Sequence, residues 1–508
     1  MADESTSAKR REPDEESAIP THARYIWLRL TFVVLSLASV GTAAAADAAL
    51  ERAAATMGVA RLTSIRYSGD GVGYTFGQAY RPGQPWPKVT VRSFTRTINY
   101  QTASMRDEII FARAEGLGGG GYPHVAPQRN DQYVSGAFAW NQTSVGPVAG
   151  SRFVDDRVHQ LWLTPHGILK AALRNSATVG RETRGGRSYA TVAFTEPGRF
   201  TAVAFIDSNG LVTRVESRLP DPVLGDTPVI TTYDDYRDYG GIKFPARVAQ
   251  SEGGFPVLDL AVHDVVPNAP ADIALPDAVR TATDRVTVEP VANGVWFLAG
   301  GSHNSVVIEM KDHVIVVETP LNDERSEAVL AKAKELVPGK PVRFVINSHA
   351  HFDHSGGLRA AAAEGATIIT QAQNKPYLEH AFAVANTIKP DRLARSGRKP
   401  RFVVVGDKMV LRDSARSVEL YHVHDSHHSD ALLMVYLPRE RLLVEADSFT
   451  PGPPNAPAAA PAQLNPLNVN LVENLARMKI SVDRVVPLHG RVVPVADLYA
   501  AVGQAAPR

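Results

Sequence analysis

Apolar and polar residues alternate along many segments of the first half of the chain. A period of two places every second side chain on one face of a strand, so each segment predicts a half-buried strand. Turns such as 69–71 and 209–210 contain glycine and lie where hairpins need them. The pattern predicts a curved antiparallel sheet with one or two helices, such as one over 166–175. The alternating segments are 61–67, 89–100, 189–194, 201–206, 212–219, 229–239, 242–250 and 257–265.

The second half has short apolar runs and one clear helical repeat instead. Residues 291–298, 305–309 and 314–317 are predicted strands, and the last two are joined by a turn at 311–313. Residues 325–337 carry apolar side chains at helical spacing and predict a helix. The second half therefore has a different pattern of apolar and polar residues from the first half.

The length of the chain and its Pro- and Ala-rich segments suggest how it is divided into domains. A chain of 508 residues is too long for one ordinary domain and suggests two or three. A Pro- and Ala-rich stretch between these two halves of the chain predicts a linker. The expected parts are an N-terminal segment over 1–46, a β-rich domain over 47–265, a linker over 266–286 and a second domain over 287–508.

One short segment of the second half concentrates metal-binding side chains. His349, His351, Asp353 and His354 place four potential ligands within six positions. Imidazole nitrogens and carboxylate oxygens are the ligands that a zinc-type ion takes in a site without sulfur. With this spacing, a compact turn lets the first two residues bind one metal ion and the last two bind an adjacent one.

The flanks of this segment predict where it lies in a fold. Residues 343–347 form an apolar run typical of a buried strand, and Gly356-Gly357 precedes an Ala-rich helical stretch. Strand, ligand loop and helix in this order place chemistry at the carboxyl end of a strand, as α/β folds do. Surface histidines in a polar loop are the alternative interpretation, which the density of ligands disfavours.

The spacing His349-x-His351-x-Asp353-His354 resembles the signature of the metallo-β-lactamase-fold superfamily. The resemblance covers residues from about 287 to 508. It implies an α/β fold, an αββα sandwich with a one- or two-metal site along one edge, preceded here by the mostly antiparallel β domain. It also implies three further ligands later in the chain.

The first of these implied ligands is a histidine before a buried strand at about 431–437. In the family it lies about ten residues before the proline that closes the strand, which points from Pro438 to His428. The neighbouring His427 and His424 stay open as alternatives, because the segment lacks the usual Gly-His-Thr-x-Gly pattern.

The other two implied ligands follow apolar runs. Asp447 follows the run 442–446 and matches the carboxylate that bridges two metals in the family. His489 follows the run 485–488 and matches the last ligand of the second metal. Taken alone, Asp447 could equally be a helix cap and His489 a core residue. It is their order in the chain and their placement after apolar runs that match the family.

The ligand types suggest the metal and its chemistry. A zinc-type ion lowers the pKa of bound water from about 15.7 to about 7, which supplies hydroxide near neutral pH. The resemblance implies that Asp353 binds the second metal and orients this hydroxide. One or two Zn²⁺ ions are expected, and iron or manganese accepts the same ligand types. The absence of cysteine excludes the metallo-β-lactamase subclasses with a cysteine ligand.

Other polar residues near the motifs are candidates for orienting the imidazoles or for donating a proton. Ordinary loop polarity is the competing interpretation for each of them. His303 and Tyr421 are the candidate proton donors. The candidates for orienting the ligands are Ser348, Ser355, Asp425, Asp430 and His303.

The N-terminus resembles an export signal. Arg24 and Arg29 flank a short apolar core over 30–42, and Ala43 to Ala46 offer small-residue cleavage sites. The expected location is the periplasm or the cell exterior. An uncleaved anchor in the inner membrane is the alternative, because residues 30–46 are about long enough to span a bilayer and so to associate with it.

Three functions are compatible with these features. The preferred one is an exported, dinuclear zinc hydrolase that acts on an ester, thioester, lactone or related bond of a small molecule. The second is a β-lactamase. The third is a carrier of an apolar ligand, because residues 239–245 and the strand pattern weakly resemble lipoprotein-carrier-like periplasmic domains. The net charge of +1 gives no reason to expect a nucleic-acid partner.

Overall fold

The computed structural model describes residues 43–114, 118–120, 127–283, 285–452 and 464–507. Residues from Ala44 onward form one compact unit. The predicted export signal lies almost entirely outside the described residues, and helix α1 (Ala43–Met57) begins in the expected cleavage region. Among the helices that are described, none combines the length and apolar character needed to cross a membrane.

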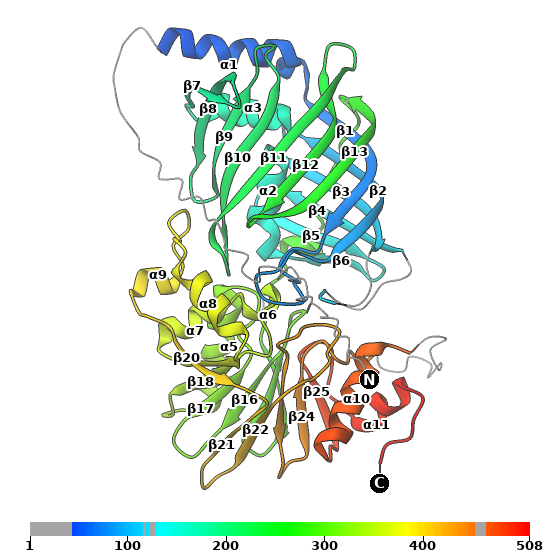
Figure 1. Cartoon of the computed structure of the whole chain (residues 1–508), viewed down its shortest axis with the longest axis vertical. Coiled ribbons are helices and arrows are strands. Elements are labelled where there is room, and N and C mark those ends of the chain that lie inside the picture. The colour runs from blue at the N-terminus through cyan, green and yellow to red at the C-terminus, as the bar shows by residue number, and fades with distance from the viewer. Residues whose placement is uncertain (1–42, 115–117, 121–126, 284, 453–463, 508) are drawn as a thin grey trace, which may run out of the picture. The chain divides into compact units, whose positions relative to one another are not determined.

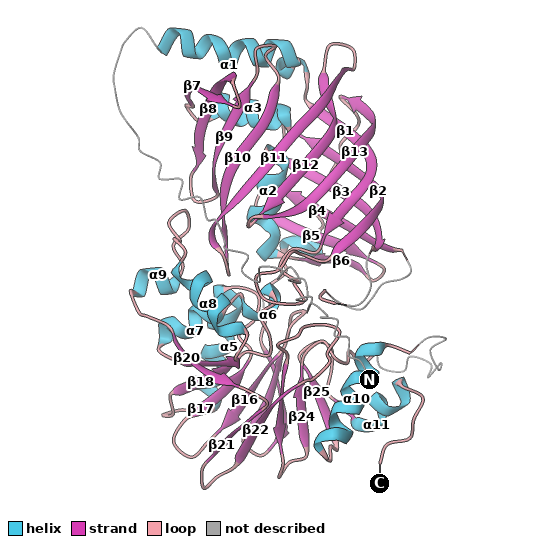
Figure 2. Cartoon of the chain, viewed as in Figure 1, coloured by secondary structure: helices cyan, strands magenta, loops and turns pink. Residues whose placement is uncertain are grey.

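A 13-stranded antiparallel sheet dominates the first part (Figures 1 and 2). Its strand order is β6-β5-β4-β3-β2-β1-β13-β12-β11-β10-β9-β8-β7, so β1 and β13 pair at its centre. The alternating segments of the sequence supply β1, β2 and β8 to β13, whereas β3 to β7 come from residues in which the sequence pattern did not predict strands. The strands are β1 (Ser64–Tyr74), β2 (Lys88–Asn99), β3 (Ser104–Arg113), β4 (Gln128–Ser135), β5 (Phe138–Thr143), β6 (Gly146–Ala149), β7 (Thr178–Arg184), β8 (Arg187–Glu196), β9 (Phe200–Ile206), β10 (Val212–Asp221), β11 (Gly225–Asp238), β12 (Lys243–Glu252) and β13 (Phe255–Pro267).

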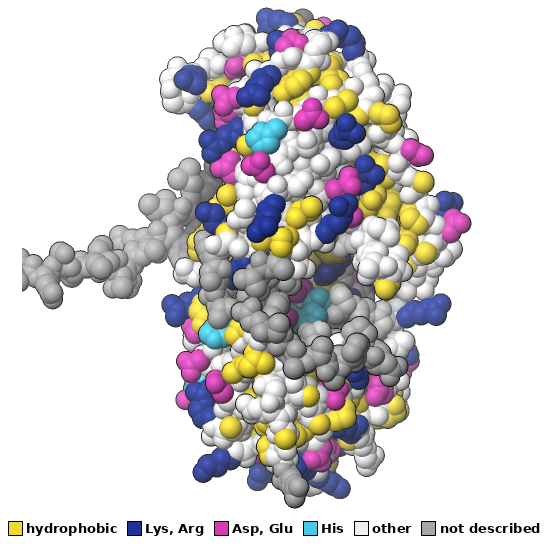
Figure 3. Space-filling view, turned by 90° about the vertical axis from the view of Figure 1, so that its right-hand side faces the viewer, with side chains coloured by type: hydrophobic (Ala, Val, Ile, Leu, Met, Phe, Trp, Pro, Cys, Tyr) yellow, Lys and Arg dark blue, Asp and Glu magenta, His cyan; other side chains and the backbone are white. Residues whose placement is uncertain are grey.

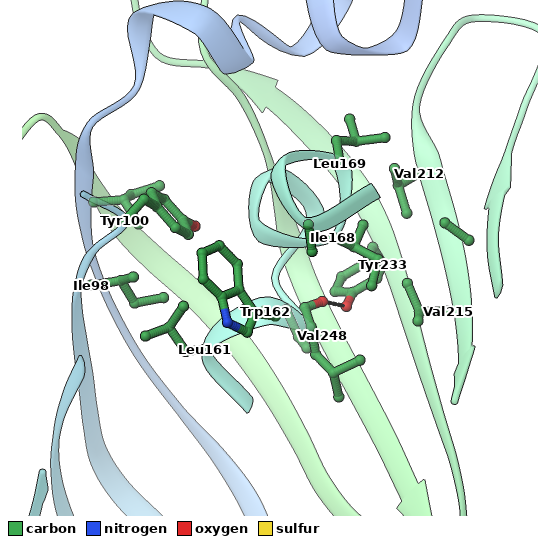
Figure 4. Packing of buried hydrophobic residues seen from close by; sticks show 14 of the residues in the cluster. Ile98, Tyr100, Leu161, Trp162, Ile168, Leu169, Val212, Val215, Tyr233 and Val248 are labelled. Carbon is green, nitrogen blue, oxygen red and sulfur yellow. Dashed lines mark hydrogen bonds between the residues drawn. The ribbon is translucent and has the colours of Figure 1, made fainter. Parts of the chain in front are cut away.

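Two helices cover the inner face of this curved sheet. They are α2 (Val154–Trp162) and α3 (Pro165–Arg174), and short 3-10 turns η1 (Val59–Arg61) and η2 (Ser151–Phe153) precede them. Figure 4 shows Trp162 and Ile168 from these helices packed among strand residues such as Val215 and Val248. The hydroxyl of Tyr233 on β11 donates to the carbonyl of Leu163 and ties the helices to the sheet. The apolar face of the sheet is thus buried where α2 and α3 cover it.

The second part is a sandwich of two sheets flanked by helices (Figure 2). One sheet has the order β14 to β20 and the other β21 to β26. The strands of the first sheet are β14 (Thr287–Ala292), β15 (Val295–Ala299), β16 (Ser305–Glu309), β17 (Val314–Val317), β18 (Val342–Ile346), β19 (Thr367–Gln371) and β20 (Arg401–Val405). Those of the second are β21 (Lys408–Arg412), β22 (Ser417–His422), β23 (Leu433–Leu437), β24 (Leu442–Glu445), β25 (Arg484–Pro487) and β26 (Val493–Pro494).

Apolar side chains fill the space between these sheets and below the helices. One core joins the facing sheets with α10 and α11, and a second lies between the first sheet and helices α5, α7 and α8. This arrangement confirms the predicted α/β sandwich after an antiparallel β domain. The helices are α4 (Asp277–Arg280), α5 (Asp323–Leu336), α6 (Phe352–Ser355), α7 (Leu358–Glu364), α8 (Asn374–Ala383), α9 (Arg392–Ser396), α10 (Pro466–Met478) and α11 (Val495–Ala501).

The β domain contacts the sandwich through the segment that joins β1 to β2. Phe76 and Trp86 of this segment meet Phe352 of α6 edge to face, with ring centroids 5.2 and 5.5 Å away. Gly77 is held close to the same ring and has a φ of 75°, and an added Cβ would lie 2.6 Å from Phe352 Cγ. A glycine is therefore required where this segment crosses α6.

Gly356 and Gly357 are required by close packing and not by an unusual backbone conformation. Their φ values are −62° and −107°, which other residues adopt readily. A Cβ on Gly357, however, would lie 1.6 Å from Ser326 Oγ of α5. The expected tight turn after the ligand loop is therefore also a close approach of two helices.

We predict that Gly357→Ala lowers the apparent melting temperature of the chain. The added methyl has no room and should cost about 1–3 kcal/mol of folding free energy. Gly406→Ala is the matched control, because no atom lies within 4 Å of its added Cβ. Thermal unfolding followed by circular dichroism tests this, and equal melting temperatures of the two variants would contradict it.

Candidate metal centre

Three buried histidines form the first group of the site. His349 and His351 lie in the loop after β18, and His428 lies in the loop before β23. Nε2 of His349 is 3.0 Å from Nε2 of His428, and the rings of His351 and His428 are 4.5 Å apart. One ring nitrogen from each lies within 4.8 Å of the others, which is compact enough to surround one ion.

A second group lies beside the first. Nε2 of His354 is 3.1 Å from Nε2 of His489, and both rings lie beside the carboxylate of Asp353. Asp447 stands between the groups: its Oδ2 is 2.8 Å from His354 Nε2 and 3.6 Å from His428 Nε2. The structure thus brings together all seven residues that the sequence predicts as ligands.

Parallel strand pairs explain why these residues meet. His349 follows β18, Asp447 follows β24, and His489 follows β25. Strands β24 and β25 pair in parallel, so their carboxyl ends reach the same edge of the second sheet. Residues far apart in the chain therefore share one edge of the sandwich, as in other α/β sites.

Two of the ring nitrogens that point away from the centre have carbonyl acceptors. His351 Nε2 lies 3.0 Å from the carbonyl of Ala79, and His489 Nδ1 lies 3.1 Å from the carbonyl of Ser302. A carbonyl accepts only, so these outer nitrogens carry the protons and the opposite nitrogens keep their lone pairs. The freed nitrogen of His351, Nδ1, is buried without a hydrogen-bond partner among the described residues. This is the tautomer pattern of metal-binding histidines, so the residues present fit a metal ion.

Electrostatics couple the histidines to the carboxylates. Burial by itself would raise the pKa of Asp447, but the neighbouring His354, His428 and His489 outweigh it and hold that pKa well below its ordinary value. Burial opposes the charged form of His354 as well, yet Asp447 and Asp353 raise its pKa well above 6.5. The cluster thus stabilises positive charge beside Asp447, where a cation would bind.

Burial is the largest influence on the pKa values of His349 and His351, on the other side of the site. It lowers the pKa of His351 to about 3, with the nearby His428 adding to the effect. It also lowers the pKa of His349 well below 6.5. Both imidazoles are therefore neutral near pH 7, as metal ligation requires.

Two buried glutamates that sequence analysis did not single out support the ligands. Glu318, which follows β17, accepts from the Ser348 amide at 2.6 Å and faces His354 Nδ1 at 3.5 Å. Glu445, at the end of β24, accepts from the amides of Ser448 and Phe449 and so holds the turn that carries Asp447. Burial raises the pKa of Glu445 to about 8. A carboxylate at the end of an apolar strand was the available signal for both.

Glu318 and Asp447 also share an unusual backbone. Their φ values are 66° and 59°, in the left-handed region that non-glycine residues seldom adopt. Such a conformation costs about 1–3 kcal/mol and persists where the surroundings fix it. Here the hydrogen bonds of the two strand-end turns fix it, and both side chains are aimed at the histidine cluster.

The β domain contributes two groups that sequence analysis missed. Gln78 Nε2 donates to Asp353 Oδ1 at 2.7 Å, and the carbonyl of Ala79 faces His351 as described. Neither residue type nor spacing marks them in the sequence, because they reach the site only when the β1–β2 segment packs on α6. The opposite oxygen of Asp353 is 3.0 Å from His303 Nε2.

Of the residues predicted to orient the metal ligands, some contact a ligand side chain and others do not. His303 contacts Asp353, and Ser348 Oγ lies 2.9 Å from His349 Nδ1. The Ser355 hydroxyl instead donates to the carbonyl of His351. Asp425 and Asp430 pair with arginines outside the histidine cluster, as Arg477–Asp425 and Arg81–Asp430.

Tyr421 was wrongly proposed as a proton donor. Its hydroxyl is held on β22 between Glu419 and Lys408, because alternation along the strand turns it away from the histidines. His424 lies with Asp407 and His422 in a separate group, so only His428 of the three candidate histidines lies against His349.

Residues 298–485 match the sequence model of the metallo-beta-lactamase superfamily. Most of the sandwich and of the histidine-rich edge described above lies in this matched stretch. The chain is also 24% identical over 172 residues to the 2,4-dinitroanisole O-demethylase subunit alpha of Nocardioides sp. (strain JS1661). That match covers 33% of this chain and 48% of the relative, so the chain spans about half the length of the curated relative that it matches.

Solved structures similar to the chain include metallo-beta-lactamases from two bacteria. That from Hirschia baltica is 21% identical, covers 44% of this chain and 99% of its own, and has a TM-score of 0.32. That from Pontibacter korlensis is 18% identical, covers 43% and 98%, and also has a TM-score of 0.32.

We predict that Glu318→Gln weakens metal binding. Losing the carboxylate beside His354 should lower the affinity for Zn²⁺ by about 10- to 100-fold, the range typical of residues that orient metal ligands. Glu324→Gln, an exposed position of α5, is the matched control. Competition with a chromogenic chelator measures the affinity. Equal affinities of wild type and Glu318→Gln would show that Glu318 does not orient the ligand.

Proposed function

We propose that the chain is a metal-dependent hydrolase of a small ester, thioester, lactone or related bond. The observation that carries this proposal is the pair of ligand groups beside Asp447, in which imidazole nitrogens and carboxylate oxygens converge closely enough to hold metal ions. The match to the superfamily model supports a hydrolase in general. The particular bond and the use of zinc are part of the proposal.

In this proposal His349, His351 and His428 hold one ion, and Asp353, His354 and His489 hold a second, with Asp447 between them. A bound zinc-type ion supplies Lewis acidity and makes water nucleophilic near neutral pH. Two ions are proposed because the two groups of ligand atoms are distinct and adjacent.

Asp353 is the residue proposed to orient the attacking water. Gln78 and His303 each contact one of its oxygens, so the carboxylate cannot rotate freely. Its side chain is 26% exposed, whereas those of His349 and His354 are almost fully buried. Asp353 is thus both fixed in direction and open to an entering molecule.

The alternative of a carrier for an apolar ligand is less well supported. A carrier would need an open apolar surface inside the curved sheet, and α2 and α3 cover part of that surface (Figure 4). The β-lactamase alternative differs from the main proposal only in the bond cleaved, and an activity panel distinguishes them.

We predict chelator-sensitive hydrolysis by the purified chain. A panel of chromogenic esters, thioesters, lactones and β-lactams would identify the bond. An aryl methyl ether belongs in it because the Nocardioides relative is an O-demethylase subunit. His428→Ala should reduce turnover to the level of the chelator-treated protein, because it removes a ligand from the first group.

His427→Ala is the control for this experiment. It removes the adjacent imidazole, which lies outside the groups of the centre, and should leave turnover unchanged. The proposal fails if wild type and His428→Ala hydrolyse the same substrate at equal rates, or if chelator has no effect on either.

We also propose export to the periplasm or the cell exterior, on the charged flank, apolar core and small residues before Asp47. The full chain expressed in a bacterial host should be recovered outside the cytoplasm with its first residue between 44 and 48. N-terminal sequencing measures this, and an intact N-terminus in the membrane fraction would favour the anchor.

A further inference from the structure

A cavity of about 570 Å³ extends from the candidate metal centre into the β domain. Asp353 and Phe352 line one part of it, together with Gln78 of the β1–β2 segment. Residues of β2, β3, β4, β10, β12 and β13 line much of the rest, together with residues of η2 and α2. The volume is in the range of small-molecule sites in proteins. A molecule in this cavity would therefore reach a proposed metal ligand.

The cavity wall is largely apolar, and charged side chains are set into it. Arg96 and Asp107 form a buried two-pronged ion pair across it, at 2.7 and 2.6 Å. Arg157 is fully engaged as well, with the carbonyls of Tyr133 and Trp140 as acceptors. These guanidinium groups already have partners, so they shape the wall and are not available to a ligand.

Arg152 differs from these two arginines. Its guanidinium stacks on Phe153, with Cζ 4.4 Å from the ring centroid. Among the residues that the structure describes, it takes part in no hydrogen bond or ion pair. The residue is exposed to solvent, yet enough protein surrounds its guanidinium for burial to lower its pKa, which Asp353 partly offsets.

The charge that acts on Arg152 is the carboxylate of Asp353. In the proposed function this carboxylate binds a metal ion, which would neutralise it and leave Arg152 without a counter-charge. Three carboxyls, of Asp156, Asp221 and Glu252, also line the cavity. Burial raises the pKa of each, that of Asp221 to about 6, which shifts these carboxyls toward their uncharged forms without neutralising Asp221 at pH 7.

We propose that this cavity is the substrate chamber and that Arg152 binds an anionic group of the substrate. The inference rests on the proposed function and names the substrate class: a hydrolysable molecule that carries a carboxylate or phosphate group apart from the bond cleaved. A planar guanidinium suits both anions because it donates two parallel hydrogen bonds.

Basic and acidic side chains of the described residues are intermixed on the face shown in Figure 3. Arg395 offers an internal comparison. It lines a neighbouring cavity of about 490 Å³, which Arg152 also borders, but it does not line the chamber. The inference therefore predicts different consequences for the two arginines.

The test is a calorimetric titration of the full chain with phenylacetate and phenyl phosphate, before and after removal of metal by chelator. Phenylacetamide is the neutral match. Arg152→Ala should weaken binding of at least one anion about tenfold or more, whereas Arg395→Ala should not. Arg152→Lys keeps the charge without the two-pronged geometry and should bind with intermediate affinity.

The binding result is separate from the hydrolysis result. Two results would contradict the proposal that this cavity is the substrate chamber, even if the chain is a hydrolase. One is absence of anion binding by wild type, and the other is equal binding by wild type and Arg152→Ala. Arg152-dependent binding in the metal-free chain would support the chamber even if no substrate is turned over. The anion that binds more tightly identifies the substrate class as carboxylate or phosphate.

A kinetic arm checks the same residue during turnover. Mono-4-nitrophenyl succinate carries a carboxylate that 4-nitrophenyl butyrate lacks. Arg152→Ala should raise KM for the succinate about tenfold and leave both parameters for the butyrate unchanged. An equal loss with both esters would assign Arg152 a general structural role and contradict the inference.

Discussion

The structure depends on keeping five imidazoles and two carboxylates together at the buried edge of one sandwich. Polar groups removed from water cost free energy unless each finds a partner, and charged ones cost more. The protein meets this constraint by fixing the outer nitrogens of His351 and His489 with backbone carbonyls. The inner atoms are left facing one another around Asp447, an arrangement that a cation would stabilise and that side chains alone would not.

The turns around the centre follow from the same constraint. Asp447 reaches the cluster only through a backbone in the left-handed region, and Glu445 holds that turn by accepting two amide hydrogens. Glu318 does the same after β17, where it meets the amide of Ser348. Strained backbone and buried carboxylates thus coincide where the ligands must be held in fixed directions.

The β domain is part of the site and not only an attachment to it. Its β1–β2 segment packs aromatic rings on α6 and in doing so brings Gln78 to Asp353 and Ala79 to His351. The antiparallel sheet supplies a wall beside the open side of Asp353. A domain whose superfamily match begins near residue 298 is therefore completed by residues more than two hundred positions earlier.

The sequence by itself determined the two architectures and the ligand loop. Alternation with a period of two predicts the antiparallel sheet, and the loop His349 to His354 is local, so its spacing is visible in the chain. Asp447 and His489 could be found because each ends an apolar run. Only the tertiary structure decided His428 over His424, because burial beside His349 is a matter of packing. The roles proposed for Gln78, Glu318 and Arg152 likewise depend on neighbours that are distant in sequence. No local sequence pattern encodes these contacts.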